Sequence, residues 1–175
     1  MAQLVLTVVG DDRAGLVNAL AQAVSGAGGN WEQSELAELA GAFAGIVLVT
    51  VPDDRVDELT GALQSLDGLL RVTVHGGVGS TLASDEAGSE RPDTLSFTVL
   101  GNDRPGIVRD VTTAIAAHAL SIDAFRSRTL EAPMAGGTLF EASVSVSVPR
   151  GVDAEAITAA LEALAGEIQV DLTVG

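Results

Sequence analysis

The chain has 175 residues, of which 47% are hydrophobic and only 3% aromatic, so it can bury an aliphatic core and does not have the composition of a disordered chain. Nine Lys and Arg stand against 24 Asp and Glu, and the formal net charge of -15 would repel nucleic-acid phosphates and an anionic membrane surface. The sequence has no cysteine, which excludes disulfides and thiolate chemistry. We find no basic leader and no apolar run long enough to span a bilayer, so we expect a soluble, cytoplasmic protein.

The chain contains an internal repeat. Residues 4–17 read LVLTVVGDDRAGLV and residues 95–108 read LSFTVLGNDRPGIV, which match without a gap. A repeat of this kind indicates two copies of one structural unit. We therefore analyse the two copies together, element by element.

Each copy is predicted to begin with an apolar strand, Gln3–Val9 or Thr94–Leu100. An amphipathic helix follows, over about Ala14–Ala27 or Pro105–Ala119, and Pro105 suits a first helical turn. Two further strands come next in each copy, predicted at Trp31–Leu39, Phe43–Val51, Ile122–Leu130 and Thr138–Val148. Local propensity at residues 35–39, within the first of these strands, also permits a helix. We predict a strand there, because the order of elements in the repeat requires one.

A second helix is predicted after Pro52 or Pro149, with Asp53 and Asp153 as N-cap residues. A last strand closes each copy, at Leu69–His75 and Ile168–Val174. The order βαββαβ, twice, predicts an α+β fold of two ferredoxin-like modules, each an antiparallel sheet with both helices on one face. We predict module boundaries at 1–76 and 94–175, joined by a flexible Gly- and Ser-rich linker at 77–93.

With this topology and the loops GDDRAGLV (Gly10–Val17) and GNDRPGIV (Gly101–Val108), each copy resembles the ACT domain family. The second loop is the closer match, because the first has Ala14 in place of proline. The hairpin segment APMAGGTLF of residues 132–140 resembles that of small tandem ACT regulators of the glycine cleavage system. Those proteins have no enzyme domain and are thought to act through a DNA-binding protein partner.

The resemblance implies binding of a small effector, usually an amino acid, with glycine as one candidate, at interfaces between ACT modules. The family's ligand residues map onto the loop after strand one and onto the start of strand two. In the first copy these are Asp11, Asp12, Arg13, Ala14, Gly15, Leu16, Asn30 and Trp31. In the second copy they are Asn102, Asp103, Arg104, Pro105, Gly106, Ile107, Ser121, Ile122 and Asp123.

The residues of the loop support this assignment by their own chemistry. Gly15 and Gly106 permit a ligand to approach the backbone, and a helix N-terminus attracts a carboxylate. Asp11, Asp12 and Asp103 could accept hydrogen bonds from an ammonium group. Alternatively, the glycines serve the turn geometry alone, the aspartates cap the helix, and the arginines pair with surface acids.

Other site classes find no support in the sequence. The glycine spacing of the loops lacks the Lys and Ser or Thr of a phosphate-binding loop. His75 and His118 have no spaced partners for a metal, Trp31 suits a core or an interface, and no acid–base pair indicates an enzyme. We expect no cofactor, no metal and no catalytic residue.

Two functions remain from these observations. The first is a non-catalytic regulator that binds an amino acid and signals through a changed module interface, as a homo-oligomer or dimer with a protein partner. The second is an interaction or oligomerisation module that binds no ligand. An enzyme on the same scaffold is the third and least supported hypothesis.

Overall fold

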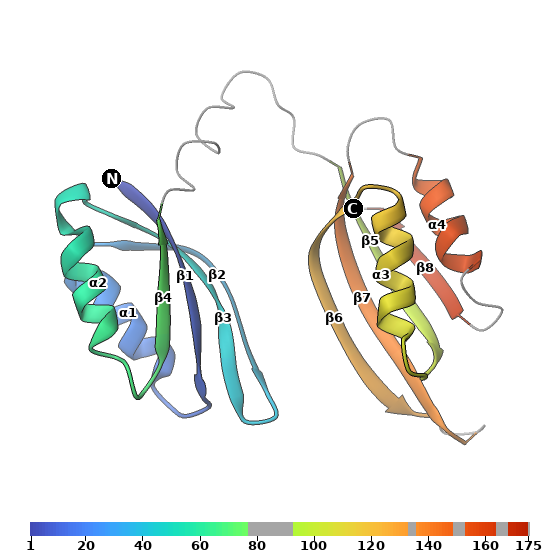
Figure 1. Ribbon diagram of the computed structural model, residues 1–175, viewed down its shortest axis with the longest axis horizontal. Coiled ribbons are helices and arrows are strands. Elements are labelled where there is room, and N and C mark those ends of the chain that lie inside the picture. The colour runs from blue at the N-terminus through green and yellow to red at the C-terminus, as the bar shows by residue number, and fades with distance from the viewer. Residues whose placement is uncertain (77–92, 133–135, 149–152, 164–167, 175) are drawn as a thin grey trace. The chain divides into compact units, whose positions relative to one another are not determined.

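The computed structural model describes residues 1–76, 93–132, 136–148, 153–163 and 168–174 (Figure 1). The chain divides into two compact units, Met1–Ser89 and Glu90–Gly175, which we call the first and second modules. The predicted linker lies outside the described residues, apart from Asp93, which is the first residue of a strand.

The first module has the predicted order of elements. They are β1 (Ala2–Asp11), α1 (Leu16–Gly26), β2 (Asn30–Leu39), β3 (Ala42–Val51), the short 3-10 helix η1 (Asp53–Arg55), α2 (Val56–Gln64) and β4 (Arg71–Gly76). Residues 35–39 are strand, so the repeat predicted them correctly and the helical alternative is wrong.

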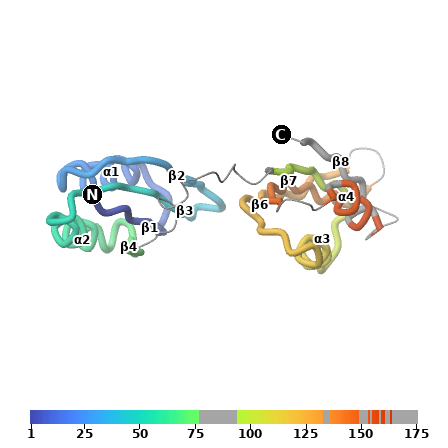
Figure 2. Tube along the Cα trace, turned by 90° about the horizontal axis from the view of Figure 1, so that it is seen from above, coloured from blue at the N-terminus to red at the C-terminus, as the bar shows by residue number. Residues whose placement is uncertain are grey.

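The sheet of the first module has the order β2-β3-β1-β4, and all its pairings are antiparallel. Alternate residues of β1 are buried at Leu4, Leu6 and Val8, as period-two patterning requires. Leu20 of α1 and Leu59 of α2 lie in the same hydrophobic cluster, so both helices cover one face of the sheet (Figures 1 and 2). The opposite face of the sheet carries the remaining side chains of β1 and β3.

The second module repeats this arrangement. Its elements are β5 (Asp93–Asn102), α3 (Ile107–Ala117), β6 (Ser121–Glu131), β7 (Thr138–Val148), α4 (Ala154–Ala163) and β8 (Ile168–Val174). The sheet order is β6-β7-β5-β8, and β5 pairs antiparallel with β7 and β8. Its core contains Val99, Ile115 and Ile157 from the sheet and both helices. The α+β class with two βαββαβ modules is therefore confirmed.

The first helix of each module begins two residues later than predicted. Gly15 has φ +92° and Gly106 has φ +86°, both in the left-handed region, and each directly precedes its helix. A left-handed residue cannot belong to a right-handed helix, so Pro105 lies in the loop and not in the first helical turn. The sequence identifies the glycine but not the sign of its φ.

One of the two predicted helix caps is wrong. The Asp53 carboxylate accepts a hydrogen bond from the chain's N-terminal amine at 2.7 Å, and η1 has no side-chain cap. Asp153 does cap α4, because its Oδ1 accepts the N–H of Glu155 at 2.9 Å. The inserted 3-10 turn moves the start of α2 away from Asp53.

The left-handed glycine gives a test of the loop geometry by stability. Gly15→Ala should lower the free energy of unfolding of the first module by about 1 kcal/mol, although an added Cβ has open space around it, because the cost is in φ. Gly61→Ala, inside α2 and also in open space, should raise it by about 1 kcal/mol. Urea unfolding followed by fluorescence of Trp31, the single tryptophan of the chain, measures both. Equal effects of the two substitutions on the free energy of unfolding would contradict the left-handed conformation of Gly15.

Candidate functional site

The loop of the first module connects the C-terminal end of β1 to the buried start of α1. The backbone N–H of Asp12 donates to the carbonyl of Gly41 in the β2–β3 hairpin at 2.8 Å, which fixes the loop at this end of the sheet. The side chains of Asp11 through Ala14 and the backbone of Gly15 are exposed, whereas Leu16 is 2% exposed and anchors the helix in the core. Of the predicted residues, 11–15 therefore form an exposed loop, and Leu16 is the buried first residue of α1.

The start of α1 has no side-chain cap. Its first intrahelical bond runs from the N–H of Ala19 to the carbonyl of Gly15 at 2.9 Å. The described part of the chain offers no acceptor to the N–H groups that precede this bond in the first turn. The alternative that Asp11 or Asp12 caps the helix is therefore wrong, and the helix N-terminus is available to an anion.

The loop of the second module has a similar backbone geometry, with one further hydrogen bond, from the N–H of Ile107 to the carbonyl of Arg104 at 3.3 Å. The N–H of Asp103 donates to the carbonyl of Thr138 at 2.8 Å, and Gly106 again precedes a helix without a side-chain cap. Asn102, Asp103, Arg104 and Pro105 are exposed, and Ile107 is buried. The repeat of the sequence is thus also a repeat of the candidate site.

The two loops differ in their arginines. In the second module, Arg104 donates to Asp110 of α3 at 2.7 Å, and Arg109 donates to the same carboxylate at 3.0 Å. These contacts, that of Arg104 first, lower the pKa of the Asp110 carboxyl below its ordinary value of 3.8. In the first module Ala19 stands at the matching position of the repeat, and the acid found near Arg13 among the described residues is Asp11, at 3.9 Å. The alternative that the loop arginines pair with surface acids therefore holds for Arg104 more than for Arg13.

The start of strand two is shaped by a β-bulge in both modules. The pairing of β2 with β3 shifts register between Trp31 and Gln33, and that of β6 with β7 shifts between Ile122 and Ala124. The extra residue is an acid in each case, Glu32 or Asp123. The Glu32 carboxylate accepts from both the Asn30 amide and the Thr50 hydroxyl at 2.8 Å, which lowers its pKa, and Asp123 accepts from the Ser147 hydroxyl at 2.7 Å.

Glu32 is a candidate residue that the sequence analysis missed. Its match to Asp123 in the repeat was the available signal. The neighbouring residues of strand two have separate roles: Trp31 packs against the core as predicted, whereas Ile122 is 37% exposed.

The two halves of the predicted site lie at opposite ends of each sheet. In the first module Asn30 pairs with Thr50, which pairs with Gln3, whereas Asp11 pairs with Ala42. The eight residue-to-residue steps of β1 from Gln3 to Asp11 span about 26 Å. The ladders of β5, β6 and β7 place Ser121 and Asn102 in the same way. A single module does not bring the loop and the start of strand two together.

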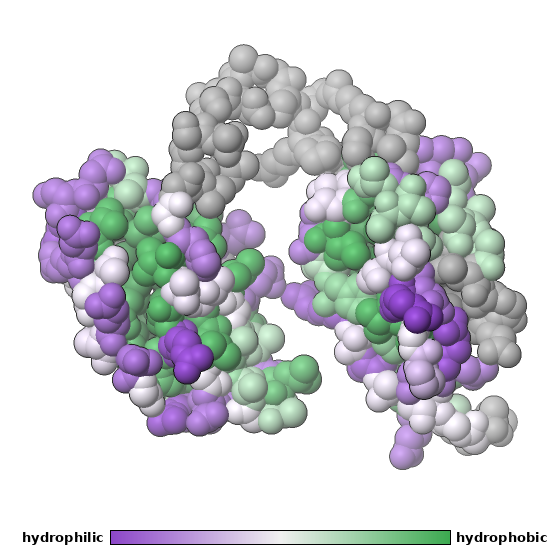
Figure 3. All heavy atoms as spheres, viewed as in Figure 1, coloured by the Kyte–Doolittle hydropathy of each residue, from purple (hydrophilic) through white to green (hydrophobic). Residues whose placement is uncertain are grey.

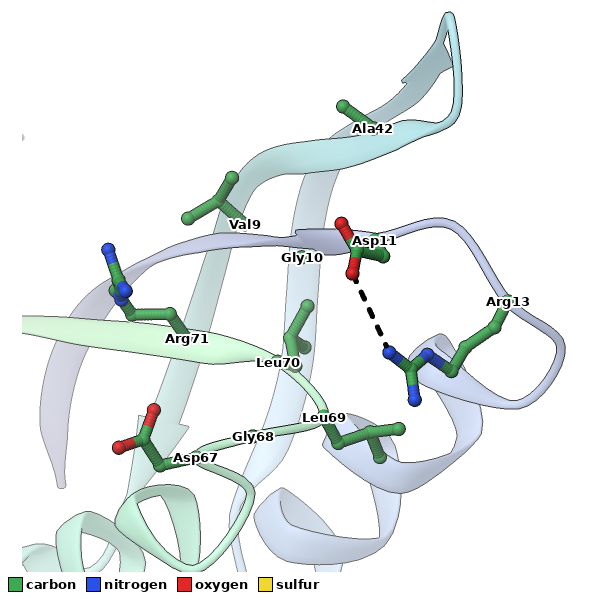
Figure 4. Close-up of a pocket in the computed structure, with 10 residues that line it drawn as sticks. All are labelled: Val9, Gly10, Asp11, Arg13, Ala42, Asp67, Gly68, Leu69, Leu70 and Arg71. Carbon is green, nitrogen blue, oxygen red and sulfur yellow. Dashed lines mark ion pairs between the residues drawn. The ribbon is translucent and has the colours of Figure 1, made fainter.

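A pocket of about 390 Å³ lies beside the loop of the first module, between the end of β1 and the turn that precedes β4 (Figure 4). Of the predicted residues only Asp11 and Arg13 line it, and Asp67, Gly68 and Arg71 were not predicted. Sequence spacing could not reveal this pocket, because the pairing of β1 with β4 creates it.

The histidines match the ordinary roles expected of them. The ring of His75 contacts the Thr7 hydroxyl at 3.1 Å on the exposed sheet face, and His118 follows the last turn of α3. Within the described residues, no cluster of His, Asp and Glu has the arrangement of a metal site. No helix in that part of the chain is long and apolar enough to cross a membrane.

The ion pair of the second loop is testable by titration. Asp110 has a lowered pKa when folded, so its contact stabilises the fold above about pH 4 and is lost as the pH falls through the folded pKa. Arg104→Gln should raise the pKa of Asp110 toward 3.8, as measured by NMR of the carboxyl carbon. Arg128→Gln, in which the lost partner is Glu141, should leave it unchanged. An ordinary pKa in the unaltered protein would contradict the ion pair.

Comparisons with known proteins agree with the repeated fold. One ACT domain model matches residues 2–76, and another ACT domain model matches residues 96–166. The glycine cleavage system transcriptional repressor of Escherichia coli K12 is 27% identical over 167 residues, which cover 94% of this chain and 85% of that protein.

Two solved structures align over almost the whole chain. A protein of unknown function from Galdieria sulphuraria has a TM-score of 0.83 and 29% identity, over 99% of this chain and 98% of its own. A structure described as a candidate glycine cleavage system transcriptional repressor has a TM-score of 0.67 over the same shares of the two chains, and its 19% identity supports the fold alone. Together with the family matches and the two βαββαβ modules, these likenesses show that the chain is a tandem member of the ACT domain family.

Proposed function

We propose that this protein is a non-catalytic cytoplasmic regulator that binds a small amino acid between ACT modules and acts through a protein partner. The observation that carries the proposal is the separation of two complementary half-sites to the two ends of each module. One half-site offers N–H groups to a carboxylate, and the other offers a carboxylate to an ammonium group. The proposal requires no cofactor and no metal.

The loop half-site suits the carboxylate of the ligand. The first turn of α1 presents backbone N–H groups at the positive end of the helix dipole, and so does that of α3 apart from the N–H of Ile107, which donates to the Arg104 carbonyl at 3.3 Å. Gly15 has open space where a Cβ would lie, so a ligand can approach its backbone closely. The glycine therefore serves both the turn geometry and access to the site.

The half-site at the start of strand two suits the ammonium group. Glu32 and Asp123 each keep carboxylate lone pairs beyond the hydrogen bonds that hold them. Because this half-site lies at the opposite end of the sheet from the loop, one ligand can contact both only when two modules pair in opposite directions. Such pairing is available within one chain or in a homodimer, and it places the ligand at the interface.

The shape of the loop and the net charge of the protein bear on the identity of the effector and of the partner. An exposed loop without a deep apolar pocket favours a small ligand, and the similarity to a glycine cleavage repressor makes glycine the first effector to test. The net charge of -15 disfavours direct contact with DNA. We therefore propose that the partner is a DNA-binding regulator protein and not DNA itself.

The proposal is tested by a thermal-shift screen of amino acids on the full chain, followed by calorimetry. A ligand of the folded state should raise the melting temperature by mass action. Asp123→Asn keeps an acceptor for the Ser147 hydroxyl and removes the charge, so it should weaken binding about tenfold. Asp57→Asn on α2 is the matched control and should bind normally. Absence of a shift with every amino acid, on folded protein, would refute the proposal.

A second candidate function is an oligomerisation module that binds no ligand. Apolar side chains reach the surface of the first module (Figure 3), and Ile46 and Val9 on its open sheet face are 51% and 46% exposed. Exposed apolar side chains on one face are typical of an interaction surface.

This second function predicts a different outcome. Ile46→Asp should shift the protein to a smaller assembly in sedimentation velocity, while its unfolding free energy changes by no more than about 0.5 kcal/mol. Thr73→Asp, on the same sheet face, tests whether any added charge has this effect. An unchanged assembly in the Ile46 variant would remove this alternative.

A further inference from the structure

Two of the few arginines of the acidic first module line its pocket. Residues 1–76 contain ten Asp and Glu and only three Arg. Arg55 is held by Glu58 and by the carbonyl of Gly26. The other two, Arg13 and Arg71, both line the pocket of about 390 Å³ (Figure 4).

These two guanidinium groups are weakly engaged. The nearest acidic oxygen to Arg13 belongs to Asp11, at 3.9 Å, beyond a normal hydrogen bond. Arg71 extends from β4 beside Val9, with which it is paired in the sheet, and no hydrogen bond or ion pair of its guanidinium is found among the described residues (Figure 4). A ligand can therefore accept hydrogen bonds from these guanidinium groups without breaking strong contacts within the protein.

The backbone around the pocket is well fixed. After α2, the N–H groups of Leu69 and Leu70 both donate to the carbonyl of Leu66 at 2.9 Å. Gly10 lies so close to this turn that an added Cβ would be 2.9 Å from the Leu69 carbonyl oxygen. The turn therefore holds Asp67 and Arg71 at defined positions against the end of β1.

We propose that this pocket is a separate binding site for a small monocarboxylate, whose carboxylate group accepts hydrogen bonds from Arg71, while Arg13 adds a second positive charge on the other side of Leu70 (Figure 4). Guanidinium groups match the planar carboxylate and bind it through charge-assisted hydrogen bonds. Asp67 and Asp11 balance the two arginines, so the pocket disfavours ligands with two negative charges and accepts an ammonium group on the same molecule. The volume holds a ligand of a few non-hydrogen atoms with water.

The site is distinct from the loop half-site of the proposed function. The pocket shares Asp11 and Arg13 with the loop, but Asp12, Ala14, Gly15 and Leu16 do not line it. Among the described residues, the second module lacks the counterpart of Arg71, because strand register places Gln169 at that position. In addition, Arg104 of the second module is bound by Asp110. The modules thus differ in which small ligands they can hold.

The proposal is tested by NMR titration of the full-length protein with acetate, methylammonium and glycine in separate series. Acetate and glycine should shift the amide signals of Gly10 and residues 68–71 in a saturable way, and methylammonium alone should not. Arg71→Gln should weaken acetate binding about tenfold, and Arg71→Lys should weaken it less because the charge remains. Arg128→Gln in the second module is the matched control and should bind as the unaltered protein does.

Three outcomes overturn the proposal: no saturable shift with acetate, equal binding by Arg71→Gln, or shifts of equal size with sodium chloride at the same ionic strength. The Trp31 fluorescence of each variant verifies that the first module is folded. The result is separable from the proposed function, because Asp123→Asn should leave acetate binding at this pocket intact. Glycine binding that is lost only in Asp123→Asn would support the interface site and refute the pocket as a glycine site.

Discussion

The antiparallel pairing of β1 with β3 and β4, repeated by β5 with β7 and β8, determines where every candidate binding residue lies. Because the first strand is central, the loop that follows it is at one end of the sheet. The long β2–β3 hairpin then returns to that end, so the start of β2 is at the other. This constraint separates the helix N-terminus from the acid of the β-bulge, and under the proposed function a complete amino-acid site would require two modules.

The repeat made the fold predictable from the sequence, because two weak patterns at a constant offset support one another. The strand assignment of residues 35–39 depended on it and was correct. The errors arose where conformation depends on geometry that residue type does not specify. The sign of φ at Gly15 moved the helix start, and the 3-10 turn removed the capping role of Asp53.

The candidate site was predictable to the same limited extent. The loop glycines and acids were visible as a motif, but an acid in a β-bulge is recognised only when the strand register is known, as for Glu32. Arg13 and Arg71 line one pocket although they are 58 positions apart in the sequence, because strand pairing forms the pocket, and no local pattern encodes that pairing. The contact of Arg104 with Asp110, in contrast, joins a loop to the next helical turn and was foreseeable only as a general tendency of arginines to pair.

The two modules have the same backbone fold but different charged residues at corresponding positions. This difference bears on how a ligand could signal. A ligand shifts an equilibrium between arrangements only by its difference in affinity for them. Under the proposed function, a site assembled from opposite ends of two modules would have that difference by construction, because an unpaired module cannot bring its two half-sites to one ligand. Ligand binding and module pairing must then stabilise one another to the same extent. In contrast, the pocket beside Arg71 is complete within one module, so its occupancy need not change with pairing. It would influence pairing only through the nearby loop of residues 11–13, and the two kinds of site would therefore respond differently to dilution of the protein.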